Sequence, residues 1–181
     1  YNSMSEEDRW KVQARFWKAV ASISKDSPAI FCYDLMNEPV SPAGQRKGAD
    51  WLGPPLGDKH FVQRISLDRQ DRKREDIAKQ WIGTLVKAIR EVDQKHLITV
   101  GLVDWSLDRP GLTSGFAPDK IADDLDFISV HLYPETGKVT EALQTLAGLA
   151  VRKPIVIEQT LPLKCSLAAF GQFVAGSKTQ A

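Results

Sequence analysis

Two glutamates, Glu38 and Glu158, each follow a short apolar run in this sequence and stand 120 residues apart. Further polar or aromatic residues occur at the ends of these and the other apolar runs, namely Asn37, Trp105, His131 and Tyr133. A protonated and an ionised carboxyl group that flank a substrate can act as general acid and nucleophile on a glycosidic bond. This chemistry requires a fold that brings the ends of separate elements to one place.

Five segments of the sequence have helical character. Ser5 predicts a helix N-cap, with Asp8 completing a capping box, and apolar residues then recur at helical spacing as far as Ile23. The clearest amphipathic helix is expected over 75–92, where apolar residues stand four apart. Shorter helices are expected near 119–124, over 139–150 and from 166 to about 176.

Four β-rich runs alternate with these helices, and we expect strands over 29–36, 97–103, 127–133 and 155–158. Because a helix follows each strand, the order of elements favours parallel strands joined by helical crossovers. Parallel α/β proteins build their sites at the carboxyl ends of the strands, which is where the candidate residues stand. The sequence therefore predicts an α/β fold with a site at that edge.

Alternation along the predicted strands divides the side chains between two faces of the sheet. In the first strand, the odd positions Phe31, Tyr33 and Leu35 suit a layer of helices, whereas Asp34 shares its face with Glu38. A buried carboxyl group needs a partner. The predicted strands offer Asp34 no basic residue, so we expect an Arg from outside this chain to provide one.

Three motifs in order along the chain resemble a known family. YDLMNEP (33–39) is similar to the fourth-strand signature of the retaining (β/α)8-barrel glycoside hydrolases of clan A, and most similar to family 5, the cellulase family. VHLYP (130–134) resembles the sixth strand of that family, and KPIVIE (153–158) resembles the seventh. The family commonly has Gly before its nucleophile and an aromatic residue after it. Ile157 and Gln159 stand there in this sequence, which leaves the subfamily and substrate open.

The resemblance implies a role for each matching residue. Glu38 corresponds to the general acid/base, Glu158 to the nucleophile, and Asn37 to the residue that hydrogen-bonds the 2-hydroxyl of the sugar. His131 and Tyr133 correspond to active-site residues that contact substrate. We also expect Tyr133 to hydrogen-bond Glu158 and so favour its ionised form.

The resemblance also implies the extent of the fold. Residues 1–181 are expected to form the C-terminal-half portion of one (β/α)8 TIM barrel catalytic domain, approximately from helix 3 through helix 7. Residues 40–74 are expected to form the long loop after the fourth barrel strand. We expect a longer chain to supply the remaining barrel strands, so that the isolated piece lacks part of its site. On family grounds we expect a secreted or periplasmic rather than a cytoplasmic protein.

Composition disfavours several other classes of function. The chain has 24 Lys and Arg against 23 Asp and Glu, and this near balance disfavours an electrostatic nucleic-acid binder. No apolar run approaches the roughly 20 residues that a membrane-spanning helix needs. Cys32 and Cys165 are too few for a disulfide framework. The expected partner is a carbohydrate substrate, with no nucleic acid and no membrane.

Three functions remain open from the sequence. The first is a retaining hydrolase of a β-linked glycan such as β-glucan or mannan, in which Trp105 provides a platform for a sugar ring. The second is a carbohydrate-binding or inactive remnant of a barrel. The third is a different (β/α)8 enzyme whose carboxylates hold a metal, which we disfavour because no His/Asp ligand cluster stands out. We therefore expect no metal site and no cofactor.

Overall fold

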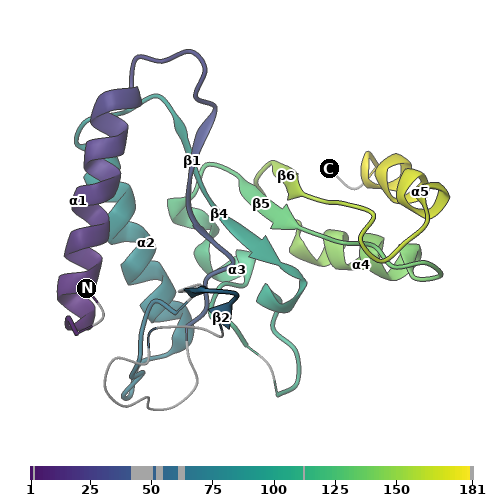
Figure 1. Cartoon of the computed structure of the whole chain (residues 1–181), viewed down its shortest axis with the longest axis horizontal. Coiled ribbons are helices and arrows are strands. Elements are labelled where there is room, and N and C mark those ends of the chain that lie inside the picture. The colour runs from purple at the N-terminus through teal and green to yellow at the C-terminus, as the bar shows by residue number, and fades with distance from the viewer. Residues whose placement is uncertain (2, 42–50, 52–54, 61–63, 112, 180–181) are drawn as a thin grey trace.

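The computed structural model describes residues 1, 3–41, 51, 55–60, 64–111 and 113–179 of the chain (Figure 1). Four strands form one parallel sheet and lie side by side in chain order: β1 (Cys32–Asn37), β4 (Leu97–Val103), β5 (Ile128–His131) and β6 (Ile155–Gln159). A separate antiparallel pair consists of β2 (Pro55–Leu56) and β3 (Lys59–His60).

Helices precede, connect and follow the four parallel strands, in the order α1 (Glu6–Ser24), α2 (Arg74–Arg90), α3 (Pro118–Ile121), α4 (Val139–Leu149) and α5 (Leu167–Ser177). Single 3-10 turns, η1 (Asp104–Ser106) and η2 (Ala122–Asp124), lie between β4 and β5. Helix α1 packs on α2, and α4 packs on α5 (Figure 1). A doubly wound sheet reverses its strand order, whereas this one does not. The predicted α/β fold is confirmed, and four parallel strands in chain order are the arrangement expected for part of a (β/α)8 barrel.

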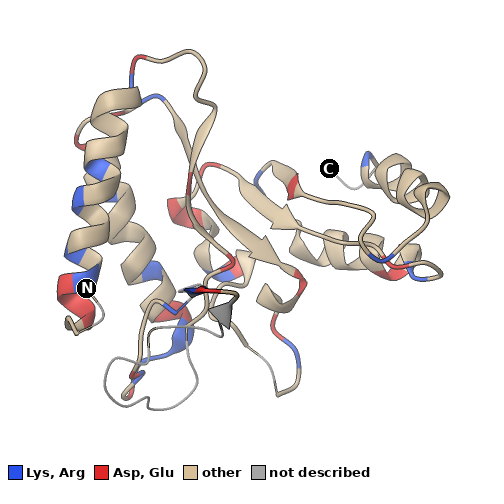
Figure 2. Cartoon of the chain, in the orientation of Figure 1, with Lys and Arg blue, Asp and Glu red and all other residues tan. Residues whose placement is uncertain are grey.

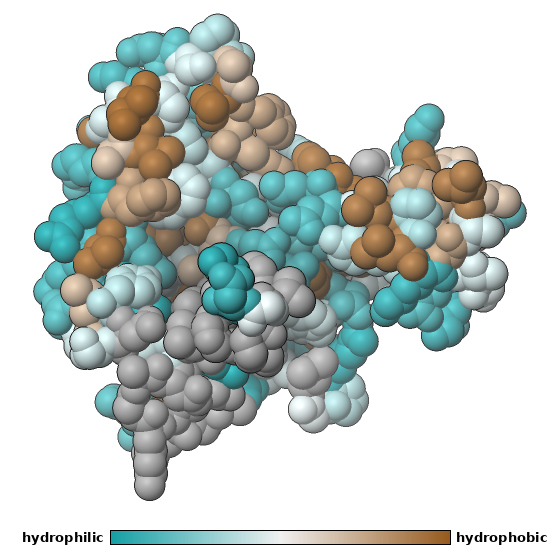
Figure 3. Space-filling model, viewed as in Figure 1, coloured by the Kyte–Doolittle hydropathy of each residue, from teal (hydrophilic) through white to brown (hydrophobic). Residues whose placement is uncertain are grey.

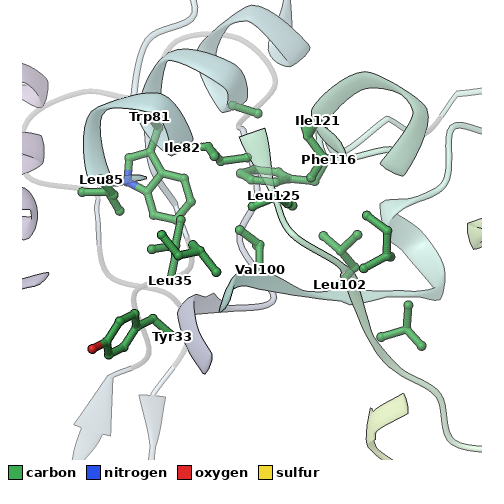
Figure 4. Packing of buried hydrophobic residues seen from close by; sticks show 14 of the residues in the cluster. Tyr33, Leu35, Trp81, Ile82, Leu85, Val100, Leu102, Phe116, Ile121 and Leu125 are labelled. Atoms are coloured by element: carbon green, nitrogen blue, oxygen red, sulfur yellow. The ribbon is translucent and has the colours of Figure 1, made fainter. Parts of the chain in front are cut away.

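One face of the sheet carries the hydrophobic core. Figure 4 shows Leu35 of β1 and Val100 of β4 directed toward the layer that contains Trp81 and Leu85 of α2. Trp81, Leu85 and Val100 are completely buried. The opposite face carries the side chains of Asp34, Thr99, Ser129 and His131, as alternation predicts. The helices therefore fix the sheet from one side and leave its polar face for a site.

The start of α1 and the bounds of β4 agree with the predictions from the sequence. The Oγ of Ser5 accepts a hydrogen bond from the backbone N–H of Asp8 at 3.1 Å and caps α1. The hydroxyl of Ser5 in turn donates to the Asp8 carboxylate. Strand β4 has the predicted bounds, because its apolar run ends where η1 begins. Local signals were sufficient for these elements.

Two strands are shorter than predicted. The first begins at Cys32, because a turn closed by the Ile30 N–H on the Ser27 carbonyl delays it. Phe31 is therefore 62% exposed, and its predicted place against the helices is wrong. The strand predicted over 127–133 ends at His131, which leaves Tyr133 beyond the ladder.

The predicted loop over 40–74 is described only in part. Residues 42–50, 52–54 and 61–63 lie outside the described residues. Within the remainder, Trp51 is buried, with the Arg9 guanidinium 3.9 Å from its ring centroid. Ile65 is also buried, and its carbonyl accepts a hydrogen bond from the Trp10 indole. The loop therefore packs against α1 at several points.

The distribution of charged residues and the state of the two cysteines agree with what the composition predicts. Figure 2 shows Lys and Arg interspersed with Asp and Glu on the helices and loops, in keeping with the net charge of +1. Cys32 and Cys165 are both free. Across the part of the chain that the structure describes, no helix is long and apolar enough to cross a membrane.

Candidate active site

Glu38 and Glu158 approach the same imidazole. The Nδ1 of His131 lies 3.0 Å from Oε1 of Glu38, and its Nε2 lies 3.7 Å from Oε2 of Glu158. The side chain of His131 is completely buried, whereas those of Glu38 and Glu158 are 21% and 35% exposed. Two carboxyl groups that are distant in sequence therefore meet at the carboxyl edge of the sheet, each open to solvent.

The strand ladder is irregular at Glu158 and just before Glu38. Strand β1 carries one extra residue between Asp34 and Asn37, and Glu158 is itself the extra residue of β6 opposite β5. Glu38 also adopts the left-handed conformation, with φ of 49°, while its N–H donates to the Gly101 carbonyl at 2.9 Å. Bulges redirect side chains, and a non-glycine residue with positive φ costs about 1–3 kcal/mol. The alternation of side chains between the two faces of a regular strand therefore does not predict where these carboxyl groups lie.

The contacts of Glu158 differ from the prediction. Its Oε2 accepts a hydrogen bond from the Ser129 hydroxyl on β5. The expected bond from Tyr133 to Glu158 is wrong, because the Tyr133 hydroxyl donates to Oε1 of Gln159 at 2.8 Å. Gln159 in turn donates from Nε2 to Oδ1 of Asn37 at 3.1 Å. The bulge at Glu158 sets Gln159 rather than Glu158 opposite the end of β5.

Gln159 is thus a site residue that sequence reasoning missed. It joins Asn37 on β1 to Tyr133 beyond β5, so that three polar side chains form a chain of hydrogen bonds along the edge. Its position in the sequence, directly after a strand-terminal glutamate, is the signal that could have identified it as a site residue. In the sequence it was recognised only as a departure from the family pattern.

Asp34 finds its partners within this chain. Its Oδ1 accepts hydrogen bonds from the backbone N–H groups of Gly101 at 2.8 Å and Met36 at 3.3 Å. Burial raises the pKa of the Asp34 carboxyl to about 7, and the negative charge of Glu158 adds to this effect. The two backbone hydrogen bonds and His131 act in the opposite direction. Backbone donors of this chain therefore contact Asp34, and the Arg expected from outside the chain stays a prediction.

Gly101 is the second residue that the sequence did not identify as part of the site. A Cβ at this position would lie 2.7 Å from Nε2 of His131 and 2.9 Å from Oδ2 of Asp34. Both distances are shorter than a van der Waals contact, so no side chain fits while these two residues keep their positions. The requirement arises across three strands and leaves no local pattern.

A pocket of about 380 Å³ opens beside Glu38. Trp105 on η1 and Tyr133 line it together with His131, and Trp105 is half-buried. Charged residues from the β5–α4 connection, from α4 and from the segment after β6 complete the wall: Glu135, Lys138, Glu141 and Lys164. A volume of this size suits a small ligand with polar groups. The structure thus brings Trp105, Tyr133 and Glu38 to one pocket, with Glu158 outside its lining.

Three residues of the polar face form a group with metal-ligating capacity. Asp34, His131 and Glu158 each offer a ligand atom, and these atoms all lie within 4.8 Å of one another. The expectation that such a cluster was absent is wrong. Its members come from β1, β5 and β6, so they become neighbours only when the sheet forms.

Comparisons with known proteins relate this chain to glycoside hydrolases. The family model described as Cellulase (glycosyl hydrolase family 5) matches residues 1–160. Mannan endo-1,4-beta-mannosidase A of Aspergillus aculeatus is 26% identical over 180 residues, which cover 90% of this chain and 40% of that protein. The endoglycoceramidase of Hydra vulgaris is 30% identical over 106 residues, which cover 59% of this chain and 17% of that protein.

A plant enzyme and a solved structure are also similar. Mannan endo-1,4-beta-mannosidase 2 of Arabidopsis thaliana is 27% identical over 127 residues, covering 61% of this chain and 22% of that protein. The structure of a β-mannanase from the blue mussel Mytilus edulis aligns with a TM-score of 0.43 and 11% identity, over 90% of this chain and 57% of that one. The chain spans less than half the length of these three curated relatives. Because the family model matches residues 1–160 of 181, the chain belongs to glycosyl hydrolase family 5, the cellulase family.

Proposed function

We propose that this protein is a retaining glycoside hydrolase that cleaves β-linked glycans by double displacement. The observation that carries the proposal is the convergence of Glu38 and Glu158 on opposite nitrogens of His131 at the carboxyl edge of a parallel sheet. Membership of family 5 supports the same chemistry. The names of several relatives make β-1,4-linked mannan the first polysaccharide to test, followed by β-glucan.

In this mechanism Glu158 is the nucleophile. Its ionised carboxylate attacks the anomeric carbon while Glu38 transfers a proton to the departing glycosidic oxygen. The resulting glycosyl ester on Glu158 is then hydrolysed by a water molecule, from which Glu38 takes a proton. The Ser129 hydroxyl orients Glu158, and His131 holds Glu38 at 3.0 Å. Both carboxyl groups return to their starting states.

Three neighbouring side chains are proposed to contact the sugar. Trp105 presents an aromatic surface in the pocket beside Glu38, which suits stacking against the apolar face of a pyranose. Asn37 and Tyr133 lie at the same edge and carry groups that hydrogen-bond hydroxyls. The pocket and the adjoining sheet edge therefore combine an apolar platform with polar contacts, as small-ligand sites generally do.

Covalent trapping tests the assignment of the nucleophile. The purified protein is incubated with aryl β-glycosides, with mannan and β-glucan, and with a 2-deoxy-2-fluoro glycoside that accumulates the glycosyl-enzyme. We expect turnover, and a label on Glu158 found by peptide mass mapping. Asp123→Asn, which changes an exposed carboxylate outside this pocket, is expected to label normally. A label on another residue, or no turnover by folded protein, would contradict the proposal.

Leaving-group dependence tests the role of Glu38. Removal of a general acid slows a reaction by roughly 10²–10⁴-fold where protonation of the leaving group is needed. We therefore expect Glu38→Ala to lose activity of that order on polysaccharides and much less on aryl glycosides with acidic phenols. Equal rates for Glu38→Ala and the unaltered protein on polysaccharide would exclude Glu38 from this role.

A further inference from the structure

The two ring nitrogens of His131 have different surroundings. Nδ1 contacts the Glu38 carboxylate at 3.0 Å. Nε2 is buried and has no hydrogen-bond partner among the described residues, and Oε2 of Glu158 is 3.7 Å away. Oε1 of Glu38 accepts a hydrogen bond from Nδ1–H both when Glu38 is ionised and when its acid proton lies on Oε2, so Glu38 holds the imidazole proton on Nδ1. Nε2 then presents a lone pair toward the polar face of the sheet.

Carboxylate oxygens face that lone pair. The ligand atoms of Asp34, His131 and Glu158 lie within 4.8 Å of one another. Oδ1 of Asp34 is occupied by two backbone N–H groups, so Oδ2 is the oxygen left to face His131. The position that a Cβ of Gly101 would take is 2.7 Å from Nε2 and 2.9 Å from Oδ2, so these two ligand atoms both lie close to one point above Gly101. An acceptor lone pair and two carboxylates thus lie within 4.8 Å of one another on the polar face of the sheet.

We propose that Asp34, His131 and Glu158 bind a divalent transition-metal ion of the Zn²⁺ and Co²⁺ class. Nitrogen and oxygen ligands lie about 2.0–2.2 Å from such an ion, so small side-chain rotations draw the three ligand atoms onto it. One imidazole with two carboxylates is a donor set that these ions accept. Three protein ligands leave a coordination position for water.

The surrounding hydrogen bonds match those of known metal sites. Histidine ligands commonly donate their second N–H to a carboxylate, which fixes the tautomer and the ring orientation. Glu38 occupies that place on Nδ1 of His131. Ser129 donates to Glu158, and backbone N–H groups donate to Asp34, so each ligand is oriented by a further contact. These contacts exist before any ion binds.

The site has a consequence that rests on the proposed function. Glu158 is the proposed nucleophile, and a carboxylate that coordinates an ion is not available to attack an anomeric carbon. Metal binding and glycoside cleavage therefore exclude each other, and the ion acts as a reversible inhibitor that a chelator removes.

Cobalt absorption tests the site without any measurement of activity. Co²⁺ is titrated into metal-free protein, and its visible absorption bands report coordination by protein ligands. We expect saturation at one ion per chain and displacement by Zn²⁺. Asp34→Asn and Glu158→Gln are each expected to weaken binding at least tenfold, while Glu141→Gln, with its exposed carboxylate outside the cluster, binds normally. Circular dichroism checks that each variant is folded.

Three results would overturn the proposed ligands. The first is the absence of saturable Co²⁺ binding, and the second is equal binding by Asp34→Asn. The third is a thiolate charge-transfer band that disappears in Cys32→Ser, because Cys32 lies two residues before Asp34 and would then be the metal ligand.

Inhibition of turnover separates this inference from the proposed function. We expect Zn²⁺ to inhibit competitively with substrate, EDTA to restore the rate, and Asp34→Asn to need at least tenfold more Zn²⁺ for half inhibition. Protein that binds Co²⁺ but shows no turnover contradicts only the proposed function. Turnover without Co²⁺ binding contradicts only the metal site.

Discussion

Gly101 shows how one residue controls the geometry of the site. Its lack of a side chain allows Asp34 and His131 to approach each other above β4. We expect Gly101→Ala to destabilise the fold by about 1–3 kcal/mol, since the new methyl group must displace a buried polar side chain. We also expect kcat to fall at least tenfold, because His131 positions Glu38. Denaturant titration and steady-state kinetics measure the two effects.

Gly83 supplies the matched control for this substitution. It lies within α2, and a Cβ there would meet nothing within 4 Å. Gly83→Ala is expected to stabilise the helix by about 0.5–1 kcal/mol and to leave kcat unchanged. If Gly101→Ala had the stability and kcat of the unaltered protein, His131 and Asp34 would not need this space.

Titration of the Asp34 carboxyl group makes the free energy of unfolding depend on pH. Its pKa in the folded protein is raised to about 7, against about 3.9 for an unfolded chain. Between these values the folded state holds the proton more tightly, so the contribution of Asp34 to stability falls as pH rises from about 4 to 7. The substitution Asp34→Asn removes the titrating group, and with it the fall in stability at higher pH. The Asn side chain keeps an oxygen that accepts hydrogen bonds from the backbone N–H groups of Gly101 and Met36. The variant is therefore expected to gain stability relative to the unaltered protein as pH rises.

Thermal unfolding at pH 5 and pH 8 checks this expectation. The difference in melting temperature between Asp34→Asn and the unaltered protein should be larger at pH 8. Asp123→Asn, at an exposed position, serves as the control and should show no such trend. A difference for Asp34→Asn that is the same at both pH values would mean that Asp34 does not titrate in this range.

Among the elements, α2 makes the largest contribution to the layer that supports the sheet. Leu85 is completely buried within the core cluster. We expect Leu85→Ala to cost about 2–5 kcal/mol of unfolding free energy, through lost burial and the cavity that remains. Phe16→Ala removes a larger side chain from α1, but that side chain is 59% exposed, so its cost should stay near 0.5 kcal/mol. Urea titration of both variants tests the assignment, and equal costs would contradict it.

The elements themselves could be predicted because their signals are local. The helix start at Ser5 and the bounds of β4 follow from residues within a few positions. The bulges at Glu158 and after Asp34 could not be predicted, since an extra residue is defined only against the partner strand. The prediction that Tyr133 hydrogen-bonds Glu158 is wrong for the same reason, because the bulge at Glu158 places Gln159 opposite the end of β5.

At the scale of the molecule, the described sheet ends at β1 on one side and at β6 on the other. Apolar side chains are exposed after β6 and on α5, and Figure 3 shows hydrophobic atoms gathered at that end: Leu161, Leu163, Leu167 and Val174. A closed barrel has no strand edges, and open edges with apolar neighbours promote association. The surface therefore supports the proposal that further barrel strands complete this sheet.

Self-association of the 181-residue chain follows from this surface. We expect the chain, produced alone, to elute as a species larger than a monomer at micromolar concentration. Leu163→Lys combined with Leu167→Lys should lower the apparent mass, because both side chains are mostly exposed and the charges oppose apolar contact. Light scattering measures the mass and circular dichroism measures the unfolding. A stable monomer with a cooperative melt would show that the chain is a whole domain.

The sequence by itself determined the order of elements, the parallel sheet, the family and the residues at the strand ends. These features depend on periodicity and motifs within single segments. Only the tertiary structure decided that Glu38 and Glu158 share His131, that Gly101 must lack a side chain, and that Asp34 belongs to the same cluster. Such contacts depend on strand register and bulges, which one segment cannot encode without its neighbour.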